Sequence, residues 1–281
     1  MPSSGAAAGL GLLSAATWGG SDFVGGLGAR RSPALLVVCS GHLVSLLVLI
    51  AICLEMKLPL PGAHPLIFAA IGGFEGSLAL AVFYHALAMG AMGLTAALTG
   101  LLTALVPVVF ALFHEGLPTP LTGVGLALGC VAIWLITQSP AAKGVAVPPL
   151  ALLLGALSGV GFGTQLILFK MAGSGGILWA MTATRGAGVV ALLLLLVVMP
   201  PKGAWRGFWW IGIAAGMLDT LGSLFYLQAT RVGRMDVAAV VCSLYPAGTI
   251  LLAALVLREW PTRRQVAGMG LALAAVMLLS L

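Results

Sequence analysis

Six ionisable side chains stand inside long apolar stretches of this 281-residue sequence. They are Asp22, His42, Glu75, His85, Arg185 and Asp219. Placing such a group in hydrocarbon costs about 2.5–3.5 kcal/mol or more, so it must face a water-filled space or pair with another polar group. Proton uptake, ion pairing and binding of a charged ligand are the chemistry that these residue types can perform.

The carboxylates of Glu75 and Asp219 are candidates for proton coupling. A carboxylate in an apolar environment can take up and release a proton as its access to water changes. The alternative is structural: each carboxylate pairs with Arg185 or a hydroxyl group, or lies nearer the membrane interface. The sequence leaves both interpretations open.

Arg185 is the one cation deep within an apolar stretch. Its guanidinium could hold the carboxylate of a ligand in bidentate fashion, or it could neutralise Asp22 or Asp219. Asp22 follows Trp18 by one helical turn, so both project from one face and offer a carboxylate and an aromatic plane to a cationic or amino group. Packing of Trp18 beside a hydrogen-bonded Asp22 is the competing structural role.

Further polar residues within apolar stretches could line a binding cavity. They are Tyr84, His85, Gln165, Tyr226, Ser243 and Tyr245. Small-molecule sites combine apolar walls with a few such polar groups, so we predict that these residues bind substrate together with Trp18, Asp22 and Arg185. For His85, hydrogen-bonded packing is the alternative.

The composition excludes the soluble classes of protein. Hydrophobic residues make up 61% of the chain and Asp, Glu, Lys and Arg only 7%, against about 25% charged residues in a soluble domain. The net charge of +6 comes from scattered basic residues, without the basic stripe of a nucleic-acid-binding protein. The sequence therefore predicts an integral protein of the lipid bilayer with no nucleic-acid partner.

The sequence also lacks the common enzyme motifs. It contains no G-x-x-x-x-G-K-[ST], H-E-x-x-H or G-x-S-x-G. The four cysteines are widely spaced in apolar stretches at Cys39, Cys53, Cys130 and Cys242. We expect them to act as small hydrophobic residues. The prediction is a non-enzyme with no catalytic residue, metal or cofactor.

Charges and helix breakers divide the chain into ten apolar units, each near the roughly 20 residues that a membrane-spanning helix needs. The units are residues 6–28, 33–54, 65–89, 93–113, 120–137, 149–170, 177–199, 207–230, 235–257 and 264–281. No basic region precedes the first apolar unit at the N-terminus, so we expect no cleavable signal peptide. The predicted fold class is an all-α integral membrane protein with ten transmembrane helices.

The chain repeats itself at a spacing near 144 residues, which divides it into 1–140 and 141–281. The repeat pairs Glu75 with Asp219, Glu115 with Glu259 and Phe83-Tyr84 with Phe225-Tyr226. Each half holds five predicted helices, an odd number, so the second half must enter the membrane in the opposite orientation. Inverted repeats place a site between the halves and are typical of secondary transporters that work by alternating access.

Motifs along the whole chain carry a resemblance to a known family. They are the W-G-x-x-D-F pattern at Trp18–Phe23, the turns Ala86-Leu87-x-x-Gly90 and Ala229-x-x-x-Gly233, and the stretch Leu255–Gly270 with Glu259. On these motifs the chain resembles the drug/metabolite transporter (DMT) superfamily, in its ten-helix branch with two EamA-type repeats. The resemblance implies a multi-pass exporter of small amphipathic metabolites in the bacterial inner membrane, in the neighbourhood of YddG-type amino-acid exporters.

Substrate, coupling and assembly stay open. Amino acids are the first candidate, and cationic drugs or another metabolite class are the alternative. Nucleotide sugars and phosphorylated sugars fit less well, because phosphate carriers present several buried cations. Transport can be proton-coupled or facilitated, and the protein can be a monomer or a homodimer.

The orientation of the termini is a further open point. Eight of the thirteen Lys and Arg residues lie in connections on one side of the predicted bundle and four on the opposite side. This charge distribution favours both termini outside. The family resemblance implies both termini in the cytoplasm.

Overall fold

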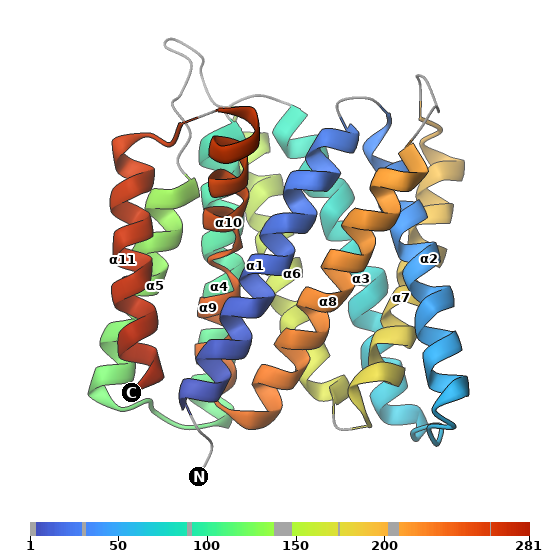
Figure 1. Cartoon of the computed structure of the whole chain (residues 1–281), viewed down its shortest axis with the longest axis horizontal. Helices are drawn as coiled ribbons and strands as arrows, with labels where there is room; N and C mark the ends of the chain where they lie inside the picture. Colours follow the sequence, from blue (N-terminus) through green and yellow to red (C-terminus); the bar gives the residue numbers. More distant parts are fainter. Residues whose placement is uncertain are drawn as a thin grey trace.

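The structure is a computed structural model of the chain. It describes residues 4–29, 32–88, 92–137, 148–173, 175–201, 208–258 and 260–281. Within these residues the chain forms helices that run up and down one bundle, and no strand (Figure 1). α1 begins and α11 ends at the same end of the bundle (Figure 1), which we call the terminal end.

The helices lie close to the predicted units. Residues 1–140 contain α1 (Ser4–Ala29), α2 (Ala34–Glu55), α3 (Ala63–Ala88), α4 (Met92–His114) and α5 (Pro120–Thr137). Residues 141–281 contain α6 (Pro149–Gly173), α7 (Ile177–Val198), α8 (Phe208–Val232), α9 (Met235–Cys242), α10 (Tyr245–Leu252), the π-helical η1 (Ala253–Leu257) and α11 (Arg263–Ser280). The unit predicted at 235–257 is therefore three consecutive pieces.

The break between α9 and α10 lies beside a proline. Pro246 stands in the first turn of α10, where its missing N–H and fixed φ are tolerated. Ser243 and Leu244 form the turn between the two helices. By contrast, Pro107 lies inside the continuous helix α4, so a proline alone does not fix where a helix ends.

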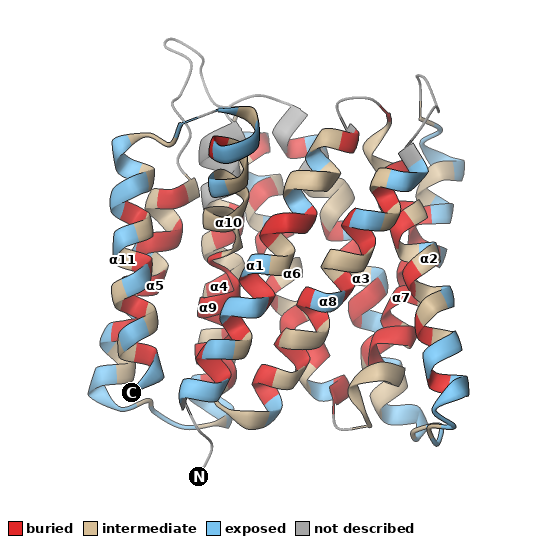
Figure 2. Cartoon of the chain, viewed as in Figure 1, coloured by how far each residue is buried: buried red, intermediate tan, exposed pale blue. Residues whose placement is uncertain are grey.

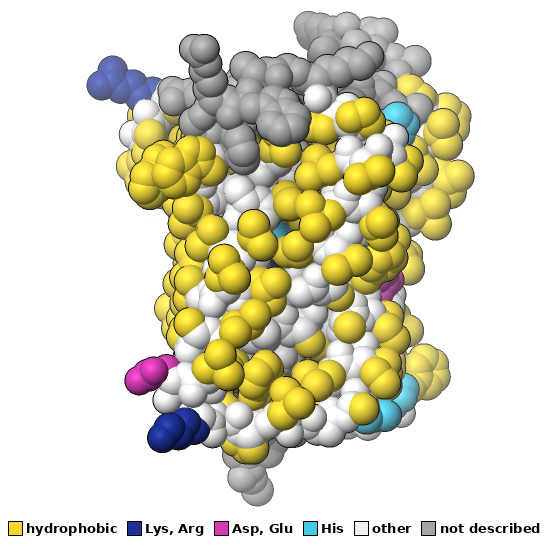
Figure 3. Space-filling model, turned by 90° about the vertical axis from the view of Figure 1, so that its right-hand side faces the viewer, with side chains coloured by type: hydrophobic (Ala, Val, Ile, Leu, Met, Phe, Trp, Pro, Cys, Tyr) yellow, Lys and Arg dark blue, Asp and Glu magenta, His cyan; other side chains and the backbone are white. Residues whose placement is uncertain are grey.

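Seven helical segments of the described chain are long and apolar enough to cross a membrane, judged by length and composition. They are α2, α5, α6 and α7, most of α3 and α8, and the segment Met235–Leu257 that contains α9, α10 and η1. Hydrophobic side chains cover the face of the bundle that contains α2 and α7, and the Lys and Arg side chains visible there lie near its two ends (Figure 3). A lipid bilayer requires such a surface.

Helices from the two halves of the sequence pack closely against each other. α1 packs on α8, α3 on α6 and α7, and α2 on α8, while α5 and α11 pair at one edge of the bundle (Figure 1). Buried residues follow these inner faces, whereas exposed residues lie mainly on the outside of the bundle (Figure 2).

Glycines permit the closest of these approaches. A Cβ placed on Gly216 of α8 would collide with the backbone of Gly41 of α2, and one on Gly73 of α3 would collide with Thr184 of α7. In lipid, helix association depends on packing and interhelical hydrogen bonds, and small residues let the backbones meet. These contacts fix α2 against α8 and α3 against α7, and with them the helices that carry His42, Arg185 and Asp219.

Candidate functional site

An ion pair lies in the interior, between α7 and α8. The Arg185 side chain is only 4% exposed, and its Nη2 donates to Oδ2 of Asp219 at 2.5 Å. Its Nη1 lies 2.9 Å from Nε2 of His42 on α2. The guanidinium thus has the intramolecular partner Asp219, which was one of the alternatives left open by the sequence.

His42 is neutral in this arrangement. Its Nδ1 lies 3.2 Å from the carbonyl oxygen of Val38, which can only accept, so Nδ1 carries the ring proton. Nε2 is then free to accept an N–H from Arg185. His42 was not among the predicted site residues, because no sequence pattern connects it with an arginine 143 residues away.

Asp22 stands beside this ion pair without joining it. Within the described residues its carboxylate has no hydrogen-bond or ion-pair partner, although it lies close enough to Asp219 for the two charges to repel. Its side chain is exposed. We call Asp22, His42, Arg185 and Asp219 the charged site.

The neighbours of Asp22 show that this exposure is internal. Trp18, one turn earlier, contacts the backbone of Asp219 on α8, and Gly19 lies against Tyr245 and its neighbours on α10. With roughly 100° between successive helix residues, Asp22 points between α8 and α10. The exposed Leu13 lies on the opposite side of α1. The accessible carboxylate therefore points toward α8 and α10, on the side of α1 opposite Leu13.

Aromatic rings form a wall next to Asp22. The Trp18 ring stacks on Tyr226 with centroids 6.2 Å apart, and Tyr245 meets it edge-on at 6.4 Å. The Trp18 Nε1 donates to the backbone carbonyl of Asp219 at 3.1 Å. Tyr226 is fully buried and donates its hydroxyl to the carbonyl of Leu166 at 3.1 Å. Trp18 and Tyr245 are half-buried, so part of each side chain is accessible.

Three other predicted site residues, Gln165, Ser243 and His85, lie apart from the charged site. Gln165 of α6 donates to the carbonyl of Gly72 at 3.0 Å, and Ser243 is buried in the turn between α9 and α10. His85 is exposed near the end of α3, and the side chain of Tyr84 lies outside the described residues. No hydrogen bond joins Gln165, Ser243 or His85 to the charged site in the part of the chain that the structure describes.

The sequence repeat pairs Glu75 with Asp219, but the two carboxylates have different surroundings. It is half-buried on α3, and a carboxylate oxygen lies beside Gly161 of α6. Ile71, Phe74 and Glu75 line a shallow apolar hollow on the surface. Among the described residues Glu75 has no ion-pair partner, so the two carboxylates have equivalent places in the repeat but different environments.

A second group of charges lies at the terminal end, and of its members the sequence repeat indicated only Glu115, which it pairs with Glu259. Lys170 of α6 pairs with Glu115, which follows α4. The Nη2 of Arg234 lies 2.7 Å from Oδ2 of Asp236 and donates to the carbonyl of Gly116 at 2.9 Å. We call Glu115, Lys170, Arg234 and Asp236 the terminal cluster. An acidic residue in the first turn of a helix, as Asp236 is in α9, is the signal that could have indicated part of it.

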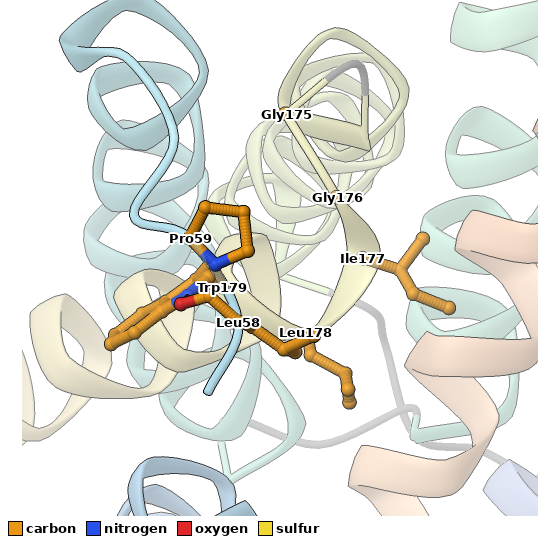
Figure 4. A pocket seen from close by; sticks show the side chains of 7 residues that line it. All are labelled: Leu58, Pro59, Gly175, Gly176, Ile177, Leu178 and Trp179. Atoms are coloured by element: carbon orange, nitrogen blue, oxygen red, sulfur yellow. The ribbon is translucent and has the colours of Figure 1, made fainter. Parts of the chain in front are cut away.

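An apolar pocket near the terminal end is separate from both groups. It is lined by Leu58, Pro59 and the residues from Gly175 to Trp179 (Figure 4). The indole of Trp179 closes one side by donating to the carbonyl of Leu58 at 3.3 Å. No ionisable side chain lines this pocket, so the charged site is the better candidate for ligand chemistry.

The charges of the site favour a cation. Arg185 is paired with Asp219 and contacts His42, so no cation among the described residues is paired with the second carboxyl group of the site, that of Asp22. Such a site attracts a positively charged group and repels an anion. The described residues contain no group of three or more His, Cys, Asp or Glu side chains that could hold a metal ion.

Comparison with known proteins agrees with a membrane transporter fold. Residues 149–281 match the sequence model of the EamA-like transporter family. The comparison with curated proteins gives no match. A protein of known crystal structure superposes with a TM-score of 0.75 and 18% sequence identity, over 97% of this chain and 95% of the other. At that identity the likeness shows the fold alone.

The family match begins at the first residue of α6 and covers the second predicted half of the chain. Together with the seven long apolar helices, this match indicates a multi-pass membrane protein whose residues 149–281 are similar to the EamA-like transporter family.

Proposed function

We propose that this protein is a secondary transporter, and not an enzyme, that exports small amphipathic metabolites across the bacterial inner membrane by alternating access. In this proposal ten membrane spans form two inverted five-helix repeats, residues 1–140 and 141–281. Amino acids are the leading substrate class. The charged site and its aromatic wall lie in the central path.

The observation that best supports the proposal is a twofold pattern in the helix contacts. α1 packs on α8 as α6 packs on α3, and α2 packs on α8 as α7 packs on α3. Exchanging the two halves converts each of these pairs into its counterpart. An inverted repeat requires this relation, and transporters use it to alternate between two related conformations.

Hydrogen bonds follow the same pattern. The Ser21 hydroxyl donates to the carbonyl of Ala215 at 2.8 Å, and the Gln165 amide donates to the carbonyl of Gly72 at 3.0 Å. When the two halves are aligned at the repeat spacing of about 144 residues, Ser21 corresponds to Gln165, and Gly72 corresponds to the residue after Ala215. Matching interactions therefore join α1 to α8 and α6 to α3.

The test is transport by purified protein in proteoliposomes across a panel of amino acids, with and without an imposed proton gradient. We expect protein-dependent uptake of at least one amino acid with an apolar side chain, and none in liposomes without protein. Absence of flux for every amino acid would defeat the substrate proposal. A response to the gradient separates coupled transport from facilitated diffusion.

If transport is coupled to protons through the membrane-embedded carboxylates, Glu75→Gln or Asp219→Asn should abolish gradient-driven uptake. Glu75→Gln is the sharper test, because Glu75 has no ion-pair partner among the described residues, whereas Asp219 holds Arg185. The measurement is initial uptake with the gradient on and off, and facilitated exchange should persist in Glu75→Gln. A normal gradient response in both variants rules out this mechanism.

A carrier of phosphorylated sugars or nucleotide sugars is less well supported. Binding a phosphate calls for several free cations. Arg185 of the charged site is already engaged by Asp219 and His42. The carboxyl group of Asp22, which has no cation partner among the described residues, also offers a phosphate no favourable contact.

A further inference from the structure

We propose that the charged site recognises the protonated amine of its substrate through Asp22, and that Arg185 takes no part in binding a substrate carboxylate. This inference rests on the proposed transport function and narrows the substrate class to organic amines with a compact apolar or aromatic body. A free carboxylate on the substrate is then dispensable.

The first argument concerns Arg185. Its Nη2 is held by the Asp219 carboxylate and its Nη1 by His42. Its Nε is buried without a hydrogen-bond partner, and the whole side chain is only 4% exposed. A ligand carboxylate could reach this guanidinium only by displacing Asp219, which would leave that carboxylate without its cation. The arginine therefore orders α7, α8 and α2 around the site.

The second argument concerns Asp22, the acidic group of the site that remains unpaired. Its carboxylate is accessible and has no hydrogen-bond or ion-pair partner within the described residues. An added Cβ at Gly26, one turn further along α1, would meet no atom within 4 Å. The surface of α1 is therefore open one turn beyond the carboxylate. An ammonium group there would supply the charge that the site lacks and form a charge-assisted hydrogen bond.

The third argument concerns the body of the ligand. Trp18 and Tyr245 are half-buried beside Asp22, and their rings meet edge-on at 6.4 Å. A ring face within about 6 Å of a cation contributes a cation–π attraction, and the same face packs against an apolar group. A primary amine on an aromatic or branched aliphatic body satisfies both the carboxylate and the rings.

A matched series of compounds tests this inference. It comprises phenylalanine, phenylalanine methyl ester, phenethylamine and N-acetylphenylalanine, which separate the amine from the carboxylate. We expect the first three to bind and to compete with one another, and N-acetylphenylalanine to fail. Loss of one charge-assisted hydrogen bond corresponds to about a 10- to 100-fold change in affinity, so Asp22→Asn should weaken phenethylamine binding by that factor.

Two further variants complete the design. Asp22→Glu keeps the charge and should retain most of the binding. Glu55→Gln removes an exposed carboxylate at the end of α2 and should leave the affinity unchanged. Because Asp22 has no partner to lose among the described residues, Asp22→Asn should keep the thermal unfolding midpoint of the parent protein.

Equilibrium binding of tritiated phenethylamine to purified protein, measured beside proteoliposome uptake, separates this inference from the proposed function. Amine-specific binding without any flux would support the inference and overturn the transport proposal. Equal binding of N-acetylphenylalanine, failure of phenethylamine to bind, or undiminished binding in Asp22→Asn would overturn the inference. Equal binding of N-acetylphenylalanine, or undiminished binding in Asp22→Asn, would leave the transport proposal intact.

Discussion

Replacement of Arg234 by methionine should lower the free energy of unfolding by about 3 kcal/mol. Its partner Asp236 is fully buried at 0% exposure and is held by Nη2 of Arg234 at 2.7 Å. Removing the arginine leaves an uncompensated charge in the interior and also removes the hydrogen bond to the carbonyl of Gly116. Unfolding by SDS in mixed micelles, followed by helical circular dichroism, measures the loss.

Two matched variants show whether the buried charge is the cause. In the double variant Arg234→Met, Asp236→Leu, much of the stability should return, because replacing both partners of a buried pair is often neutral. Arg231→Met removes an exposed arginine one turn earlier, in α8, and should have little effect. If Arg231→Met were as damaging as Arg234→Met, the stabilising role of the Arg234–Asp236 pair would be disproved.

The second large effect is expected at Gly216. A Cβ at this position would overlap the Cα, carbonyl carbon and carbonyl oxygen of Gly41, and backbone atoms cannot swing aside as a flexible side chain can. Gly216→Val should therefore separate α2 from α8 and cost about 3 kcal/mol of stability. It should also reduce transport, since α8 carries Asp219 and α2 carries His42.

Gly270→Val in α11 is the control for the glycine test. A Cβ at Gly270 would meet no atom within 4 Å and the residue is exposed, so only the small difference in helix propensity applies. Thermal unfolding of the two variants in the same detergent gives the comparison. Equal midpoints would contradict the close packing of α2 on α8.

The positions of the helices could be predicted from sequence because length and apolarity are local properties. A run of about 20 apolar residues between charges or breakers defines a helix of membrane length, and α2, α5 and α7 begin and end within a residue or so of the predicted units. The division of 235–257 into α9, α10 and η1 was not predicted. It depends on how the turn at Ser243 and Leu244 packs against other helices, which no local pattern describes.

The candidate site was predictable only in part for a similar reason. The rarity of charge in this chain indicated Asp22, Arg185 and Asp219, and the one-turn spacing indicated that Trp18 and Asp22 share a face. The contact of Arg185 with His42 depends instead on the packing of α7 against α2. The role of Asp236 was also hidden, because its burial follows from the position of α9 against the loop after α4.

The pairing of α1 with α8 has a consequence for the synthesis of the protein and its insertion into the membrane. Ser14 donates to the carbonyl of Gly222, a residue 208 positions later in the chain. At about 5–20 residues per second, a ribosome needs roughly 10–40 s to make the intervening segment. During this interval α1 lies in the bilayer with the hydroxyl groups of Ser14 and Ser21 without their partners on α8. The nascent first half must therefore wait in lipid for its partner helices, and a chaperone or insertase that shields α1 would act in that interval.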